Sequence, residues 1–197
     1  MKPKNWPKEF QYSSTSIVRD IHPNIFAHFL TSSNPEHLHK ISKCIEKQKV
    51  HPHLQIKNLL PPHPLAKDRT RVQRGLFAAK KIPKDTELGE YTGEIWLNWT
   101  NAPVHSPQFD YTWVAFMNGF LINICSLNFA NELTFVNDFR GIQDKPNVKD
   151  HIIFHRGRCY FGYVTTREIL PNEELLIDYG RIWEQFYNTK EQFVRIE

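Results

Sequence analysis

The fold is decided by REILPNEELLIDYG at residues 167–180, a run in which strand-forming residues end in an acidic residue, a tyrosine and a glycine. Two earlier segments precede it, VQRGLFAAKKIPKDTELGEYTGEI at 72–95 and NELTFVNDFRG at 131–141. Each segment is a weak signal when it is taken singly, because RGLF can be a turn that enters a strand and EELLIDYG a strand with a polar end. The order and spacing of all three are far more specific than any one of them.

Together the three segments resemble the SET-domain protein-lysine methyltransferases, over about residues 66–187. The matching residues are Arg74, Gly75, Leu76, Phe77, Ala78, Ile82, Glu90, Tyr91, Gly93 and Glu94 in the first segment, Asn131, Phe135, Val136 and Asn137 in the second, and Thr166, Arg167, Glu168, Ile169, Glu173, Glu174, Leu175, Asp178, Tyr179 and Gly180 in the third. The resemblance implies a mainly β (β+α) SET-domain fold. Such a fold has several small sheets, few short helices and a C-terminal segment threaded through a loop as a pseudoknot.

Composition agrees with a β-rich globular chain. The 197 residues are 40% hydrophobic and 23% charged, which excludes a wholly disordered chain, a collagen-like repeat and a coiled coil. Runs rich in β-branched and aromatic residues, at 88–96, 111–116, 120–125 and 159–166, predict strands. Asn118-Gly119 between two of these runs predicts a hairpin turn.

Changes in residue composition and apolar pattern along the chain predict its domain organisation. Residues 1–65 are interpreted as an N-terminal appendage that packs on the main domain, with one helix capped by Ser33 or Asn34 and an apolar stripe of Leu38, Ile41 and Ile45. Residues 66–182 are interpreted as the SET domain. Residues 183–197 are interpreted as a C-terminal aromatic helix that covers the donor site as a lid.

The cysteines and histidines favour no metal site. Three widely spaced cysteines are typical of reduced thiols in a cytosolic or nuclear compartment. His51, His53 and His63, with Cys44, match no established metal pattern, so we expect loop histidines and no stoichiometric zinc. We also expect no signal peptide and no transmembrane helix.

The activity that the resemblance implies is methyl transfer from S-adenosylmethionine to a lysine amine. This direct displacement needs donor and acceptor in line. The amine, with a reference pKa of about 10.4, must first lose its proton, and burial in an apolar aromatic channel lowers that pKa. A dry channel and a positioned hydroxyl can therefore suffice without a general base.

Roles for individual residues follow from the resemblance. The implied donor-binding residues are Arg74, Gly75, Leu76, Phe77, Asn137, Asp138 and Trp183. Arg74 offers charge near the donor's carboxylate, and Gly75 permits close backbone approach. Asn137 would hold the donor's amino-acid end and the backbone of Asp138 its adenine. A plain strand-entry turn is the alternative at 74–77. An Asx turn is the alternative at 137–138, and it is compatible with the donor-binding roles of both Asn137 and Asp138.

Tyr179 is the implied catalytic residue. Its hydroxyl would orient the lysine amine, while nearby carbonyl oxygens hold the polarised methyl group by weak C–H···O contacts; a structural tyrosine is the alternative. Tyr91, Tyr111 and Ile177 are the candidate walls of the substrate channel, although either tyrosine could equally be core packing. Ile177 replaces an aromatic residue and cannot anchor a water molecule, which favours di- or trimethylation.

Several residues depart from the family pattern. Gln73 stands where the first glycine of the turn often stands, and Asn-Asp-Phe-Arg at 137–140 replaces the commoner Asn-His-Ser-Cys. These changes leave two hypotheses open. The first is a protein-lysine methyltransferase whose leading partner is a histone tail or nucleosome, and the second is a non-catalytic SET-like module that binds protein or chromatin.

The net charge of the chain and its expected cellular compartment restrict the range of binding partners only partly. The net charge of +4 does not ideally suit a basic tail, and the seven Lys/Arg at 67–84 would suit nucleosomal DNA or the donor's carboxylate better. We expect the nucleus or the cytoplasm, including the nucleus of a host if the protein is a microbial effector. No association with a membrane is expected.

Overall fold

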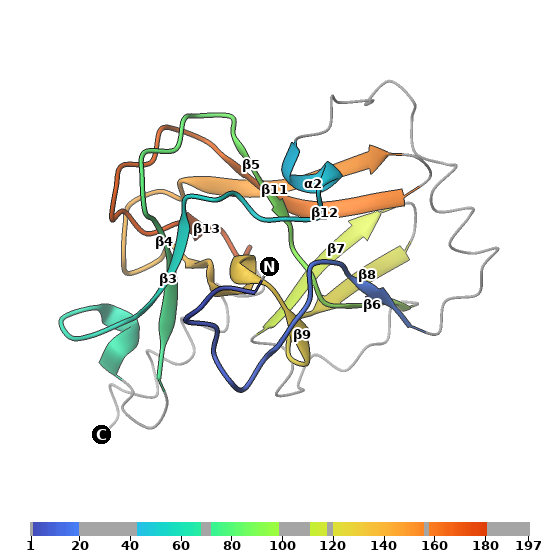
Figure 1. Cartoon of the computed structure of the whole chain (residues 1–197), viewed down its shortest axis with the longest axis horizontal. Coiled ribbons are helices and arrows are strands. Elements are labelled where there is room, and N and C mark those ends of the chain that lie inside the picture. The colour runs from blue at the N-terminus through green and yellow to red at the C-terminus, as the bar shows by residue number, and fades with distance from the viewer. Residues whose placement is uncertain are drawn as a thin grey trace.

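The computed structural model describes residues 2–19, 43–67, 72–98, 111–117, 120–155 and 158–180. Within these ranges the chain is mainly β, with five small sheets and only short helical turns between them (Figure 1). The predicted class, a mainly β chain of several small sheets with few short helices, is confirmed.

The largest sheet has four strands in the order β2-β6-β8-β7. These strands are β2 (Ile17–Val18), β6 (Glu94–Asn98), β7 (Thr112–Met117) and β8 (Phe120–Cys125). In the β7–β8 pair Met117 lies opposite Phe120, so two residues connect the strands. An Asn-Gly pair is suited to such a two-residue connection. The predicted hairpin is therefore confirmed by its pairing, while positions 118–119 lie outside the described residues.

Two further sheets each contain one strand of the first sequence segment. β11 (Val148–His155), β12 (Arg158–Thr165) and β5 (Glu87–Glu90) form an antiparallel sheet in the order β11-β12-β5. β3 (Leu54–Asn58) pairs antiparallel with β4 (Arg74–Ala78), the strand that starts the first segment.

Helical structure is confined to short turns in the described residues. These are α2 (Lys43–Glu46), η2 (Pro64–Lys67) and η4 (Glu132–Phe135). α2 contains Ile45, the last residue of the predicted stripe, and this side chain is buried. The rest of the predicted N-terminal helix and the predicted helix at 183–197 lie outside the described ranges. None of the helices that the structure describes is long and apolar enough to cross a membrane.

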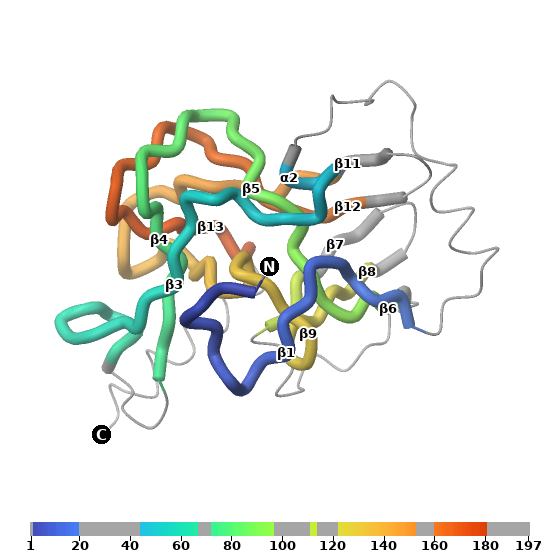
Figure 2. The backbone as a smooth tube through the Cα atoms, in the orientation of Figure 1, coloured from blue at the N-terminus to red at the C-terminus, as the bar shows by residue number. Residues whose placement is uncertain are grey.

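Residues 2–19 contribute directly to the sheets and the core. β1 (Gln11–Tyr12) pairs in parallel with β9 (Phe129–Ala130), and β2 pairs in parallel with β6. Figure 2 shows this N-terminal segment running along β9 towards β6. The buried rings of Trp6 and Phe10 meet Phe135 edge-on, with centroid distances of 5.8 and 5.5 Å. The N-terminal segment thereby closes the aromatic core on the side of η4.

The last described segment runs between β4 and β10 (Asn137–Asp138). On the β4 side, the Leu175 N–H donates to the Leu76 carbonyl at 2.8 Å. On the other side, β13 (Leu176–Ile177) pairs in parallel with β10. The loop that follows β10 then returns to β13, because the Asn147 N–H donates to the Leu176 carbonyl at 3.0 Å. Both ends of this loop contact β13, which is the threaded arrangement that the resemblance predicted.

Candidate active site

The parallel pairing of β10 with β13 joins the second and third sequence segments. Asn137 lies opposite Leu176 and Asp138 opposite Ile177, and the Phe139 N–H donates to the Ile177 carbonyl at 3.0 Å. Tyr179 follows β13 by two residues, so this register sets it beside the end of β10. The residues predicted for donor binding at 137–138 and the predicted catalytic tyrosine are therefore neighbours.

The first segment reaches the same place through the side chain of Asn137. Its amide Nδ2 donates to the Arg74 carbonyl at 2.9 Å and to Glu174 Oε1 at 2.8 Å. Gly75 leaves the space that this carboxylate occupies, because a Cβ at Gly75 would stand 2.4 Å from Glu174 Oε1. Three segments that are far apart in sequence thus converge on one buried carboxylate.

Glu174 is 6% exposed and is the centre of this network. Its second oxygen lies 2.9 Å from His63 Nε2. The Leu65 N–H donates to His63 Nδ1 at 3.2 Å, so Nδ1 is an acceptor and the proton that faces Glu174 is on Nε2. Neither the role of Glu174 nor its partner His63 was predicted, because adjacent glutamates at 173 and 174 are indistinguishable in sequence and His63 belongs to no motif.

Arg74 already has an acidic partner in the structure. Its guanidinium is paired with Glu9 Oε1 at 2.5 Å, and the Glu9 side chain is 53% exposed. Burial of Glu9 opposes ionisation, but hydrogen bonds from its own backbone and from Arg74 outweigh it and lower the pKa of Glu9. Leu76 is fully buried, and the Phe77 ring lies under Lys57 Nζ at 4.9 Å. The positive charge predicted for a donor carboxylate is present, in an exchangeable ion pair.

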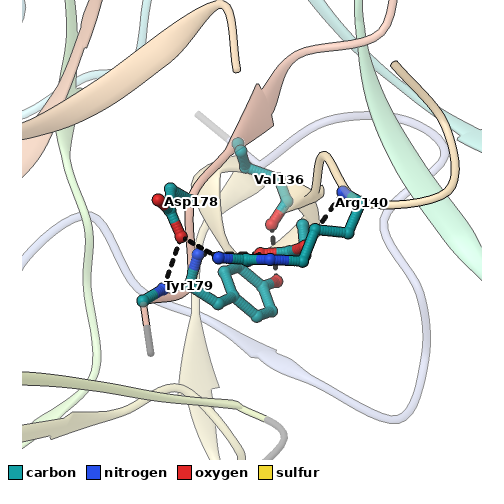
Figure 3. Close-up of polar contacts among 6 residues, drawn as sticks. Val136, Arg140, Asp178 and Tyr179 are labelled. Atoms are coloured by element: carbon teal, nitrogen blue, oxygen red, sulfur yellow. Dashed lines mark hydrogen bonds and ion pairs between the residues drawn. The ribbon is translucent and has the colours of Figure 1, made fainter. Parts of the chain in front are cut away.

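Tyr179 makes hydrogen bonds through both its side chain and its backbone. Its hydroxyl donates to the Val136 carbonyl at 2.7 Å, and its backbone N–H donates to Asp138 Oδ2 at 2.8 Å. Figure 3 shows the ring turned so that the hydroxyl faces Val136. The side chain is still accessible, since the residue is 38% exposed. A partly exposed tyrosine whose hydroxyl makes a hydrogen bond to the backbone is compatible with the predicted amine-orienting role.

Arg140 links the acidic groups around Tyr179. It donates from Nη1 to Asp138 Oδ2 at 2.7 Å and from Nη2 to Asp178 Oδ1 at 2.8 Å (Figure 3). Burial disfavours the charge of Arg140, but its hydrogen bonds to Asp178 and Asp138 outweigh that effect and raise the pKa of Arg140. Burial likewise opposes ionisation of Asp178, yet hydrogen bonds from the Gly180 N–H and Arg140 lower the pKa of Asp178.

Tyr91, one of the two candidate channel tyrosines, forms a buried pair with Tyr163. Tyr91 is 5% exposed, and its hydroxyl donates to the backbone carbonyl of Tyr111 at 3.0 Å. The rings of Tyr91 and Tyr163 lie 5.7 Å apart, and burial raises the pKa of both groups. Both therefore remain neutral hydroxyls at physiological pH. Tyr163, whose ionisation would also be opposed by Tyr179, was not predicted as part of the site.

The other predicted residues occupy different surroundings. Tyr111 is half-buried, and its ring packs against Phe10 at 5.3 Å, so part of it belongs to the aromatic core. Ile177 is 5% exposed and is a member of the same core. Trp183 lies outside the described residues. His51 and His53 stack edge-on at 5.1 Å, and the described part of the chain contains no group of three or more potential metal ligands.

The match to a protein family model identifies the family of this chain. A family model described as SET domain matches residues 73–180, which is more than half of the 197 residues. The chain belongs to the SET-domain family. The match begins at Gln73 and ends at Gly180, so it contains the second and third sequence segments and all of the first except Val72. Among the predicted site residues, only Trp183 lies outside it. A search of the curated proteins by sequence finds no match.

Solved structures share the fold of this SET-domain chain at low identity. ATXR5 in complex with mono-methylated histone H3.1 is 19% identical with a TM-score of 0.59, over 87% of this chain and 81% of that one. A PRC2 chain from Chaetomium thermophilum in an autoinhibited conformation, bound to S-adenosylmethionine, is 15% identical with a TM-score of 0.50. It is matched over 74% of this chain but only 18% of its own length. At these identities the likeness shows the SET-domain fold, as predicted.

Proposed function

We propose that this SET-domain protein is an S-adenosylmethionine-dependent protein-lysine N-methyltransferase, with a histone tail as its leading substrate. One observation carries the proposal. The β10–β13 pairing sets the hydroxyl of Tyr179 on the Val136 carbonyl, directly beside Asn137 and Asp138. These are the positions at which the family motifs carry the catalytic tyrosine and the donor-binding residues.

The residues around Asn137 fit the methyl donor chemically. S-adenosylmethionine has an ammonium group, a carboxylate and an adenine ring, and when bound it supplies a methyl group on a sulfonium. Asn137 uses Nδ2 for two internal hydrogen bonds, and among the described residues nothing donates to its Oδ1. An amide oxygen beside the buried carboxylate of Glu174 suits an ammonium group. Arg74 can turn from Glu9 to a carboxylate of the ligand.

Tyr179 would act on the lysine amine in this proposal. Its hydroxyl donates to Val136, and a phenol oxygen can also accept a hydrogen bond, which from the lysine amine would fix the direction of the nitrogen lone pair. Buried Tyr91 and Tyr163, which stay neutral, would make the channel poor in charge and favour the uncharged amine. Tyr111 and Ile177 would complete the channel walls. Trp183 and residues 183–197 would cover the donor.

The choice of a histone tail is supported by a neighbour with the same fold. The ATXR5 structure contains histone H3.1, and a partner of this kind would place the reaction in a nucleus. We include that location, and residues 66–182 as the catalytic domain, in the proposal. Lys80, Lys81 and Lys84 after β4 are exposed and would suit nucleosomal DNA. Lys81 and Lys84 lie near Glu168 and Asp85 in exposed ion pairs, which solvent screens.

A methyl-transfer assay tests the proposal. The purified chain and donor are incubated with nucleosomes, free histones and a cell lysate, and products are read by mass spectrometry, with Tyr179→Phe as the control. Titration of S-adenosylmethionine by calorimetry is run in parallel. Tyr179-dependent methylation of a lysine supports the proposal. Absence of donor binding and of methylation would refute it and favour the non-catalytic protein- or chromatin-binding module.

A further inference from the structure

Arg140 occupies a position that the proposed methyl transfer leaves without a role. It ends the Asn-Asp-Phe-Arg run at 137–140, in which the histidine and cysteine commoner in the family are both replaced. Its side chain is 18% exposed, and its guanidinium lies over the Phe139 ring at 4.9 Å. An arginine held between an aromatic face and two carboxylates is fixed in one orientation.

The two carboxylates that Arg140 joins each hold a backbone N–H of the tyrosine segment. Asp138 Oδ2 accepts from the Tyr179 N–H at 2.8 Å as well as from Arg140. Asp178 Oδ1 accepts from the Gly180 N–H at 2.7 Å as well as from Arg140. Asp138 Oδ1 also accepts from the Arg140 N–H at 3.0 Å, which fixes the start of the loop after β10.

The Arg140–Asp138 and Arg140–Asp178 ion pairs differ in strength. The Asp138 side chain is 9% exposed, so its contact with Arg140 is shielded from solvent, whereas Asp178 is 51% exposed and its ion pair is screened. Asp138 is thus a buried carboxylate whose charge is balanced by Arg140. Loss of Arg140 would leave two like charges at the ends of β10 and β13, on either side of Tyr179.

We propose, on the basis of the methyltransferase function proposed above, that Arg140 is a positioning residue for Tyr179. Together with Asp138 and Asp178 it forms a clamp, the Asp138–Arg140–Asp178 clamp, that fixes the backbone of Tyr179 and Gly180. The Tyr179 hydroxyl then reaches the Val136 carbonyl from a fixed backbone position. Because Val136 and Asp138 belong to the same short stretch, both anchors of the tyrosine move together with the donor-binding Asn137.

The planar fork of arginine is necessary for this clamp. Its two terminal nitrogens address two different carboxylates at 2.7 and 2.8 Å. A lysine carries its three donors on one nitrogen, so it cannot place a separate nitrogen on each carboxylate in the geometry that arginine has here. Arg140→Lys therefore keeps the charge but not the bridge, and it separates the geometric effect from the electrostatic one.

The test compares turnover and local dynamics in Arg140→Met, Arg140→Lys and a matched control. Arg167→Met is the control, since Arg167 is paired with Glu173, another acidic residue of the third segment, and has no contact with Tyr179 among those described. We expect kcat to fall about tenfold in Arg140→Met and less in Arg140→Lys, because small displacements of reacting groups have large effects on rate. The donor Kd and the substrate KM should change less than about twofold, and Arg167→Met should match the wild type.

A second variant distinguishes positioning from simple loss of packing. Asp178→Asn in the Arg140→Met background removes one of the two uncompensated charges while keeping an oxygen for the Gly180 N–H. It should recover about two- to fivefold in kcat, the factor that corresponds to a partly exposed ion pair. A loss of packing alone would give no recovery.

Amide hydrogen exchange at Tyr179 and Gly180 provides a readout without activity. Arg140→Met should speed exchange of these two amides about tenfold or more, and Asp178→Asn should partly reverse it. Faster exchange in a protein whose wild type shows no methyl transfer would leave the clamp standing and refute the proposed function. Unchanged exchange, or faster exchange with an unchanged kcat in an active enzyme, would overturn the positioning role of Arg140.

Discussion

Gly75→Ala probes the convergence of the three segments directly. A Cβ at this position would lie 2.4 Å from Glu174 Oε1, 3.0 Å from Glu174 Cδ and 3.0 Å from Phe77 Cε2. Contacts this short cannot be kept, so the Glu174 carboxylate must move. Its displacement weakens the hydrogen bonds to Asn137 Nδ2 at 2.8 Å and His63 Nε2 at 2.9 Å.

The expected loss of stability follows from those contacts. Hydrogen bonds to a charged group contribute about 1.5–3 kcal/mol each, and inserting a methyl group into a packed site costs about 1–3 kcal/mol. Alanine restricts the unfolded chain and offsets about 0.4–1 kcal/mol. Since Glu174 can keep part of its bonding after a shift, we expect a net destabilisation of about 2–4 kcal/mol. This corresponds to a fall in Tm of about 4–16 °C for a chain of this size.

Glu174→Ala supplies the matched background for this measurement. Without the carboxylate, Phe77 Cε2 is the one that remains of the three nearest atoms, and Gly75→Ala should then cost less than about 1 kcal/mol. Thermal unfolding of the two single variants and the double variant measures the coupling. Equal destabilisation by Gly75→Ala in both backgrounds would refute the reasoning. In the otherwise wild-type chain, loss of the Asn137 orientation should also weaken S-adenosylmethionine binding about tenfold by calorimetry.

Four further predictions test the site. Tyr179→Phe removes one hydroxyl group, which donates to Val136, and no other side-chain atom, so it should fold normally but lose about 100-fold or more in turnover in a methyl-transfer assay; near-normal turnover would remove Tyr179 from the reaction. Asn137→Ala should weaken donor binding by about 1–3 kcal/mol in calorimetric titration, and an unchanged affinity would show that the donor lies elsewhere. Ile177→Tyr should shift the product towards monomethyl-lysine by mass spectrometry, whereas a wild type that stops at one methyl with donor in excess would contradict the expected di- or trimethylation. The pKa of Asp178 is lower in the folded protein than in the unfolded chain, so ionised Asp178 contributes to stability above about pH 4, and this contribution is lost as the pH falls through the folded-state pKa. Arg140→Met should raise the titration midpoint of Asp178 in a carboxyl NMR titration. An unchanged midpoint would exclude the ion pair with Arg140.

Local patterns in the sequence predicted much of the framework. Asn118-Gly119 between two runs of strand-forming residues predicted the hairpin that pairs Met117 with Phe120. The SET-domain resemblance of the three ordered segments predicted that threading would bring Asn137 and Tyr179 together, and the β10–β13 register places Asn137 opposite Leu176, three residues before Tyr179. These predictions succeed because turn chemistry and motif spacing are properties of short stretches of chain.

Other features of the site required contacts between distant residues. Glu174 and Glu173 are adjacent acidic residues in the sequence, yet Glu174 is buried against Asn137 and His63 while Glu173 pairs with Arg167. Strand alternation points adjacent side chains to opposite faces, but it does not say which face is covered. Tyr91 likewise donates to the backbone of Tyr111 rather than to its hydroxyl, a contact that depends on where β5 and β7 approach one another.

The sequence alone determined the SET-domain resemblance and the residue types available for chemistry, because the resemblance depends on the order and spacing of three motifs. The fold class was what this resemblance implied, and composition agreed with a β-rich chain. Only the tertiary structure decided which charges are balanced. No pattern in the sequence indicates a role for Arg140. It bridges Asp138 and Asp178 because the threaded segment places these two carboxylates side by side. The physical reason is that ion pairing and burial depend on distances of a few ångströms between residues that are about 40 positions apart in the chain. Such distances are set by the packing of the whole domain and not by any local propensity.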